Sequence, residues 1–519
     1  MWWGVSDVSS PERSTSLTSS DGRRRTSLYA LLVALAAAAS FTWMFLTPLG
    51  SVPDESSHVQ YAAAVVRGQI GSGEFGRTVT IPRDVVSGTY RATCTAFAPL
   101  ATTRCQVPIQ PDSTPVSMEP GSAGYPPLYF AIVGLPTLAG FNETSWYLMR
   151  ALSVGLGIGL LAAFIPASRR HPTAWPIVGA VLGLTPMATY MLASVNPNGV
   201  EIFAGLAASI GITFLMLAAR ARDGASFVQA ATPTALALSY LILARPKSYL
   251  LAAGLVTVGL LVLPRGTWSI VRANARAVAL RVSAPALALV AALSFEVLTR
   301  HAAEAATVPV SIGLALRSAA AQIDYWVIEM VGIFGWRDFR PPVGLAFFWL
   351  AGIGAITVIA LAAARWRQRI GLVVFVVGGT VIAPTFVLLT LFRDGVGYQG
   401  RYQMPLTVGI PIVAAGILAA EYVAPGALGR RLAGWLVWGS AIVYALIWGG
   451  SVLRYAVGLP VPGPAQFAEI WAWWLNPAGT VLLVISLVGY LALVAVLSRL
   501  MGTSAAWSDE VLHDRATMN

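Results

Sequence analysis

The sequence has few charged residues, few histidines and few cysteines. Only 11% of its 519 residues are charged, and it contains four histidines and two cysteines. A soluble globular protein of this length would have about twice that share of charge. The sequence also lacks the residue spacings of zinc sites, P-loops, dinucleotide-binding folds and serine hydrolases. These absences exclude an ordinary soluble enzyme.

In place of charge, the sequence has long apolar runs, and 56% of its residues are hydrophobic. Runs of about 20 residues can cross a bilayer as helices, and their unbroken hydrophobicity excludes the alternating pattern of a β-barrel. The fold class that we expect is an all-α polytopic membrane protein with about twelve transmembrane helices. The expected spans are 28–49, 146–167, 175–194, 199–219, 227–244, 248–264, 281–299, 343–364, 370–391, 405–422, 432–450 and 477–498.

Positive charge comes almost entirely from arginine, and the net charge is +11. Such a charge is compatible with nucleic-acid binding, but in a membrane protein it is better explained by arginine-rich cytoplasmic loops, so we expect no nucleic-acid partner. Segment 124–140 is ambiguous because it is short and contains three prolines. If it spanned, loops such as "SRRH" (168–171) and "RWRQR" (365–369) would lie outside. We therefore expect a juxtamembrane helix near 125–140 and both termini in the cytoplasm.

This topology divides the chain into two tails and one membrane domain. Residues 1–27 are expected to be a disordered cytoplasmic tail, residues 28–499 the transmembrane domain, and residues 500–519 a second cytoplasmic tail. Two long external loops are expected within the domain, at 50–145 and 300–342.

Cys94 and Cys105 lie together in the first of these long loops. In an external loop they would form a disulfide, whereas in a cytoplasmic loop they would be two free thiols. The expected topology favours the disulfide.

An acidic cluster follows the first apolar run, in "SVPDESSHVQYA" (51–62). Helix capping, beginning at Ser51, can explain one of its carboxylates. It does not explain two acids together with a histidine four residues after Asp54. A partly desolvated carboxylate at a membrane edge can act as a base. We therefore assign Asp54, Glu55 and His58 as candidate catalytic residues.

Three cations in other outer segments are candidates for binding a phosphate. Lys247, the only lysine, stands in "ARPKSY" beside Arg245 and the helix-breaking Pro246. A lone lysine can occur by chance, but two cations at a helix break favour an anion site. In "GYQGRYQMP" (397–405), the glycines let the backbone approach a ligand, and Arg401 can bind a phosphate through two hydrogen bonds. The alternative there is a tight turn with interfacial tyrosines and a snorkelling arginine.

Polar and aromatic residues in the outer segments complete the candidate site. Capping explains the asparagines of "SVNPNG" equally well, and an Arg–Asp pair with interfacial aromatics is the simpler interpretation of "FGWRDF". The candidate substrate-binding residues are Tyr125, Asn196, Asn198, Trp336, Gln399 and Tyr402.

In their order along the chain, "PDE" with His58, "YPPLY", "SVNPN", "RPK", "FGW" and "QGRY" resemble the family defined by domain of unknown function 2142, from Pro53 to Pro405. That family resembles a branch of the GT-C glycosyltransferases, whose first external loop contains juxtamembrane helices and whose donor is a lipid-phosphate sugar. The resemblance implies that Asp54 is the general base. Relatives have a second acid where this chain has Asn198. Neither a metal site nor a cofactor is therefore predicted, although a divalent metal stays open.

The expected function is a membrane glycosyltransferase of the bacterial cell membrane. It would transfer a sugar, with inversion, from a polyprenyl-phosphate donor to a glycan or lipid acceptor of the cell envelope, on the external face. Arg245, Lys247 and Arg401 would stabilise the departing phosphate, and the arginine-rich composition is typical of an actinobacterium. One alternative is a flippase for a lipid-linked glycan, which should show related halves. Another is a polymerase or ligase that uses a lipid-diphosphate donor.

Overall fold

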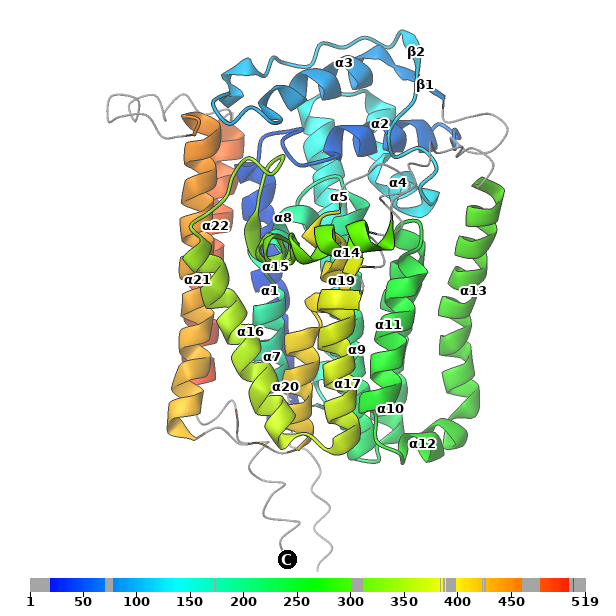
Figure 1. Ribbon diagram of the computed structural model, residues 1–519, viewed down its shortest axis with the longest axis vertical. Coiled ribbons are helices and arrows are strands. Elements are labelled where there is room, and N and C mark those ends of the chain that lie inside the picture. Colours follow the sequence, from blue (N-terminus) through cyan, green and yellow to red (C-terminus); the bar gives the residue numbers. More distant parts are fainter. Residues whose placement is uncertain are drawn as a thin grey trace, which may run out of the picture.

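The protein is a bundle of long helices, capped at one end by a layer of short elements (Figure 1). The computed structural model describes residues 19–70, 78–171, 174–299, 311–382, 384–385, 388, 398–421, 423, 426–459, 477–503 and 507. We call the capping layer, formed by the described residues of 50–142, the first-loop lobe. The opposite end of the bundle is called the arginine end.

Nine helices in the described part of the chain are long and apolar enough to cross a membrane. They are built from α1 (Ser19–Leu46), α5 (Glu143–Ala162) with α6 (Ile165–Ser168), α9 (Pro197–Arg220), α10 (Gly224–Ala244), α13 (Ala275–Thr299), α16 (Val343–Ala363), η7 (Gly400–Gln403) with α19 (Met404–Thr407) and α20 (Ile410–Ala420), α21 (Ala427–Ala456) and α22 (Pro477–Gly502).

Two bent helix pairs raise the number of candidate spans to eleven. They are α7 (Ala174–Gly183) with α8 (Pro186–Leu192), bent by 72°, and α11 (Ser248–Val262) with α12 (Thr267–Ala273), bent by 108°. The polytopic all-α fold is thus confirmed for the described residues, with nine to eleven candidate spans.

One of the twelve expected spans, 370–391, is described only in part. There α17 (Trp366–Val377) ends in a π-helical turn, η6 (Gly378–Ile382). Helical residues are described again at 384–385 and 388, whereas 383, 386–387 and 389–397 lie outside the described part, so the twelfth span stays a prediction. The other eleven expected spans coincide with the nine helices and two bent pairs.

The centre of the bundle is α9, which packs against α5, α8, α10 and α20. Its side chains are almost all buried. Gly205 permits the closest approach, because a Cβ atom there would collide with the carbonyl group of Pro405. At the periphery, α13 and α22 bury few of their side chains, as expected for helices that face lipid.

The first-loop lobe contains α2 (Glu55–Val65), α3 (Arg83–Ala92), α4 (Pro127–Val133) and the 3₁₀ helix η4 (Leu135–Ala139). Strand β1 (Val79–Pro82) pairs with β2 (Pro115–Met118) in antiparallel register, with Val79 opposite Met118. Because α4 and η4 are both short, segment 124–140 is not among the candidate spans, and it lies at the lobe end (Figure 1).

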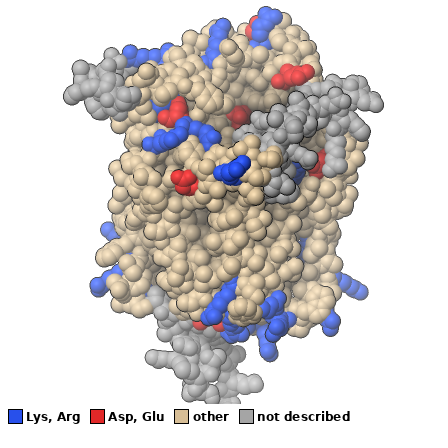
Figure 2. All heavy atoms as spheres, in the orientation of Figure 1, with Lys and Arg blue, Asp and Glu red and all other residues tan. Residues whose placement is uncertain are grey.

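The arginine-rich loops gather at the other end of the bundle. Arg220 and Arg365 both pair with Glu421, at N–O distances of 3.4 and 3.1 Å. Figure 2 shows a broad band almost free of charged side chains between the two ends on the face in view. This separation matches a bilayer-spanning protein.

The expected tails and second loop are described only in part. Helix α1 already begins at Ser19, so residues 19–27 of the expected N-terminal tail are helical, whereas 1–18 lie outside the described residues. Of the C-terminal tail, 504–506 and 508–519 lie outside them. Loop 300–342 contains α14 (Ile312–Ala320) and α15 (Ile323–Gly332), and its first residues, 300–310, are not described.

Candidate functional site

The candidate site lies where the first-loop lobe meets the helix ends, and its centre is the pair formed by Asp54 and Arg401. Arg401 Nη2 is 2.5 Å from Asp54 Oδ2. The arginine side chain is 3% exposed, whereas that of Asp54 is 46% exposed. Asp54 is therefore an accessible carboxylate beside a buried cation. Two residues that are 347 positions apart in the sequence meet here.

Helix capping does not explain Asp54. The residue occupies the N-cap position of α2, but its side chain makes no cap hydrogen bond. The hydroxyl of Ser51, the expected cap, lies 3.3 Å from the hydroxyl of Thr95 instead. Asp54 has a φ of 66°, a conformation that is uncommon for residues other than glycine and that concentrates at functional sites.

The structure does not place Glu55 where a catalytic residue would meet a substrate, because its side chain has no exposed surface. Arg150 donates to both of its oxygens, with distances of 2.7 Å from Nε to Oε1 and 2.6 Å from Nη2 to Oε2. Arg150 also donates to the carbonyl groups of Met44, Thr47 and Pro48. Glu55 and Arg150 therefore anchor the chain that leads to Asp54, and Glu55 does not face a substrate.

The charges around Asp54 hold it ionised. Burial alone would raise the pKa of this carboxyl, but the positive charge and hydrogen bond of Arg401, together with the charge of Arg245, lower the pKa below its ordinary value. At neutral pH, Asp54 is a carboxylate. While it is paired with Arg401 it is a weak base.

His58 faces the same site in its neutral form. Burial lowers the pKa of His58 to about 3, and the charges of Arg401 and Arg245 add to this effect, although Asp54 opposes it. The imidazole packs near Tyr125 and Phe130, with ring centroids 5.6 and 5.7 Å away. Its Nδ1 is buried and has no hydrogen-bond partner among the described residues. A neutral imidazole placed here can hydrogen-bond to a polar group of a ligand.

Arg245 and Arg401 converge on one aromatic ring. The guanidinium carbons lie 5.1 and 5.4 Å from the centroid of Tyr402. Burial raises the pKa of the Tyr125 hydroxyl. The hydroxyl is also close enough for the charges of Arg245, Arg401 and Asp54 to influence this pKa. The structure thus brings together five of the predicted residues around Asp54, namely His58, Tyr125, Arg245, Arg401 and Tyr402.

Glu201 is a site residue that the sequence reasoning missed. It is fully buried, and its Oε2 accepts from Arg245 Nε at 2.6 Å and from Asn198 Nδ2 at 2.9 Å. The hydroxyl of Ser248 donates to its Oε1. The signal for it was an acid near the start of an otherwise apolar span, since ionisable residues inside membrane helices are generally functional.

The two asparagines of "SVNPNG" join this network. Asn196 caps α9, because its Oδ1 accepts from the Asn198 backbone N–H at 3.0 Å, as the capping explanation expected. Its Nδ2 also donates to the Pro53 carbonyl group at 3.2 Å. Asn198 Oδ1 is buried and lacks a hydrogen-bond partner within the described part of the chain.

Glu329, also missed, supports the segment that contains Arg401. This buried residue of α15 accepts a hydrogen bond of 2.5 Å from the Gly400 N–H and lies 3.3 Å from Arg337 Nε. Burial raises the pKa of Glu329, although Arg337 opposes this shift. The signal was again an acid in an apolar stretch, "WVIEMVG".

The remaining predicted residues lie at or beyond the edge of the site. Lys247 is exposed, has a φ of 66° and makes no ion pair with a described residue. Gln399 is partly buried, and its carbonyl group accepts the Tyr402 N–H. Trp336 packs against Phe97, with ring centroids 5.1 Å apart. Its contact is therefore with the disulfide-bearing part of the lobe.

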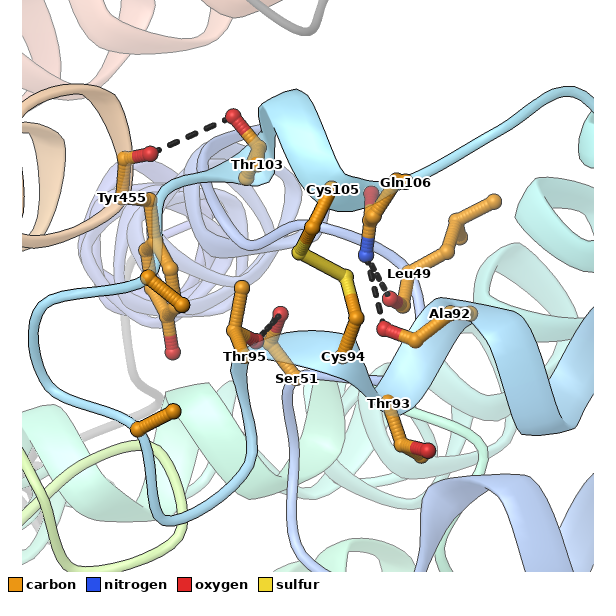
Figure 3. The surroundings of a disulfide bond; sticks show 12 residues. Leu49, Ser51, Ala92, Thr93, Cys94, Thr95, Thr103, Cys105, Gln106 and Tyr455 are labelled. Carbon is orange, nitrogen blue, oxygen red and sulfur yellow. Dashed lines mark hydrogen bonds between the residues drawn. A yellow bond between two sulfur atoms is a disulfide. The ribbon is translucent and has the colours of Figure 1, made fainter.

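Cys94 and Cys105 form a disulfide next to the chain that leads to Asp54 (Figure 3). Adjacent to it, Gln106 Nε2 donates to the carbonyl groups of Leu49 and Ala92, both at 2.8 Å. The disulfide-bearing segment is therefore fastened to the end of the first span.

Within the ranges that the structure describes, no three His, Cys, Asp or Glu side chains form a group that could hold a metal ion. Catalysis without a metal or cofactor stays a prediction.

Comparison with known families agrees with the motifs. The family model described as "Predicted membrane protein (DUF2142)" matches residues 39–410. A search of curated proteins found no match. The matched region contains Asp54, His58, Arg245 and Arg401 and covers more than half of the chain. This chain belongs to the DUF2142 family of predicted membrane proteins.

Proposed function

We propose that the protein is a membrane glycosyltransferase of GT-C type that transfers a sugar from a polyprenyl phosphate to a cell-envelope glycan or lipid. One observation carries the proposal: the accessible carboxylate of Asp54 lies beside the guanidinium groups of Arg401 and Arg245 at one end of a membrane bundle. A base beside paired cations is the arrangement that such a transfer requires.

The two arginines suit a phosphate ester. Guanidinium groups bind phosphate oxygens through paired hydrogen bonds. Arg401 Nε is buried and has no hydrogen-bond partner among the described residues, so it can donate to a ligand. The ion pair with Glu201 holds the side chain of Arg245 in place. This second cation therefore does not have to move in order to meet a phosphate.

In the reaction, the acceptor hydroxyl oxygen attacks the anomeric carbon of the donor from the side opposite the phosphate. The bond between the anomeric carbon and the phosphate oxygen breaks, and polyprenyl phosphate leaves with the electron pair. Asp54 takes the proton of the acceptor hydroxyl. Arg245 and Arg401 stabilise the charge that develops on the departing phosphate.

Arg401 links donor binding to the basicity of Asp54. In the structure its charge lowers the pKa of Asp54. A phosphate bound to Arg401 would divide that charge between two anions and place a negative charge near the carboxylate. Both effects raise the pKa of Asp54. The base is therefore strengthened when the donor is in place.

The location proposed for this reaction is the external face of a bacterial cell membrane, with both termini in the cytoplasm. Its support is the gathering of arginine-rich loops at the end opposite the site, because cytoplasmic loops have an excess of arginine. The disulfide in the first-loop lobe agrees with an oxidising compartment.

Replacement of Asp54 by Asn tests the proposal, because it keeps the size of the side chain and removes the base. With purified protein and a radiolabelled polyprenyl-phosphate sugar, we expect donor binding to persist and sugar transfer to fall by at least about a hundredfold. Asp112→Asn, another acid of the lobe, is the matched control and should transfer normally. Transfer at the wild-type rate by Asp54→Asn would overturn the mechanism. Movement of the labelled lipid across a liposome without transfer would identify a flippase.

A further inference from the structure

Helix α13 lies at the edge of the bundle (Figure 1). It packs on α10 through small residues, Ala288 and Ala292, which are buried. Small residues let membrane helices approach closely. Helix α11 packs on the same helix α10, but shares few contacts with α13. We call the surface formed by α10 between α11 and α13 the lateral furrow.

The walls of the lateral furrow are hydrocarbon. On α13, Leu289 and Leu293 are exposed and stand seven and three residues before Glu296, on the same side of the helix. On α11, Val256 and Leu260 are exposed and stand seven and eleven residues after Tyr249, on the same side of that helix. Such a surface suits a hydrocarbon chain, whether of a bulk lipid or of a specific one.

The outer end of the furrow is not hydrocarbon. A pocket there is lined by Arg245 and Lys247 from the bend between α10 and α11, by Gly124 and Pro126 from the lobe, and by Glu296 and Thr299 from α13. Arg245 belongs both to this pocket and to the site around Asp54. The pocket thus joins the furrow to the site. Its two cations match the negatively charged phosphodiester of such a donor better than a lipid headgroup without net charge.

A hydrogen bond crosses the furrow beside these cations. The hydroxyl of Tyr249 on α11 donates to Glu296 Oε2 on α13 at a distance of 3.0 Å. Glu296 is an acid on a helix that otherwise faces lipid, and such residues usually have a function because an ionisable group is costly there. This bond ties α13 to α11 at the point where a lipid headgroup would have to pass.

We propose that the lateral furrow holds the polyprenyl chain of the donor, and that the bond between Tyr249 and Glu296 is a latch that opens to admit its phosphate past Lys247 to Arg245. This inference rests on the function proposed above, and names the route by which the lipid donor reaches the site. The latch residues position α13 and are not catalytic.

A covalent link across the furrow tests the route. Tyr249→Cys and Glu296→Cys are combined and joined by a bifunctional thiol reagent in protein held in lipid nanodiscs. The native cysteines are already paired with each other and do not react. Binding of two probes is measured, long-chain polyprenyl phosphate and short, water-soluble citronellyl phosphate. We expect the link to reduce long-chain binding at least tenfold and to leave citronellyl phosphate binding within twofold.

Each single-cysteine variant treated with the same reagent is a control, since it has the modification without the link. Unchanged long-chain binding in the linked protein would overturn the furrow proposal while the proposed function stands. If neither phosphate binds the unlinked protein, the proposed function fails first. If phosphatidylglycerol in the nanodisc displaces the long-chain probe as well as polyprenyl phosphate itself does, the furrow is a general lipid site and the proposal is wrong.

Discussion

At the scale of single residues, two adjacent acids have opposite environments. Asp54 is half exposed beside Arg401, whereas Glu55 is enclosed with Arg150. The one-residue step turns the first side chain toward the site and the second into the protein, because α2 begins between them. The two neighbouring acids of "DE" thus differ in their places: Asp54 lies in the candidate site, and Glu55 belongs to a buried ion pair.

Replacement of Glu55 by Ala should affect folding more than chemistry. It leaves the buried guanidinium of Arg150 without its counter-ion, which typically costs about 3–5 kcal/mol. We expect a clear drop in the thermal unfolding midpoint in detergent, and a smaller one for Asp54→Asn, because Asp54 is half exposed although its partner Arg401 is buried. If both variants unfold at the wild-type temperature, the buried pair does not anchor this segment.

The buried imidazole of His58 makes stability depend on pH. The pKa of His58 is lowered from 6.5 to about 3 in the folded protein. Between these two pH values His58 is protonated in the unfolded chain and neutral in the folded protein. Stability is therefore full above pH 6.5 and is lost as the pH falls toward 3, by about 1.4 kcal/mol for each pH unit. As the pH is lowered from 6.5 to 3, the unfolding midpoint of His58→Gln should fall by less than that of the wild-type protein. Parallel curves for the two proteins would contradict the assignment.

Lys247 tests whether the exposed cation of the pocket meets a phosphate. A hydrogen bond to a charged group contributes roughly 1.5–3 kcal/mol, so Lys247→Ala should weaken polyprenyl-phosphate binding about tenfold or more. Lys247→Arg keeps the charge in a wider, planar group, so its affinity for polyprenyl phosphate should lie between those of Lys247→Ala and the wild-type protein. Equal binding by all three proteins would identify Lys247 as a surface residue and assign the phosphate to the arginines.

At the scale of elements, the disulfide-bearing segment is held by more than its covalent bond. Arg454 of α21 donates to the carbonyl groups of Thr95, Ala98 and Ala101 and pairs with Asp338 at 2.5 Å. This clamp joins the first-loop lobe to a helix near the other end of the sequence. The lobe is therefore part of the bundle's architecture.

Removal of the disulfide should loosen this segment without unfolding the bundle. Closing a short loop covalently contributes about 2–4 kcal/mol. The double replacement Cys94→Ser and Cys105→Ser should lower the unfolding midpoint and reduce sugar transfer, because the segment contacts the chain before Asp54. In wild-type protein, maleimide should label neither cysteine until a reductant is added. Labelling without reductant would show that the bond is absent.

Most elements could be predicted from the sequence because hydropathy and length define a span locally. Segment 370–391 shows a limit of this approach, because hydropathy does not detect the π turn that follows Val377. The site was predictable where the residues stand at span ends that the expected topology places on one side of the membrane, as Asp54, Arg245 and Arg401 do. The partners of Glu55 and the role of Glu201 were not, because a buried ion pair depends on packing between distant segments.

At the scale of the whole molecule, the separation of the lobe from the arginine end makes the topology testable. Ala221 and Ser113 are both exposed, at the arginine end and in the lobe respectively. In intact cells, a membrane-impermeant thiol reagent should label Ser113→Cys and spare Ala221→Cys until the cells are opened. The reverse pattern would place the site in the cytoplasm and exclude an external acceptor.

The distance of 347 residues between Asp54 and Arg401 has a consequence for biogenesis. The ribosome delivers the carboxylate with the first span and its cation only after most of the later spans have been made. Until that moment the nascent chain has an acid with no partner and a central helix, α9, whose contact with α20 is still missing. The candidate site is thus assembled by one of the last insertion events, so a chain that terminates before Arg401 lacks its central ion pair.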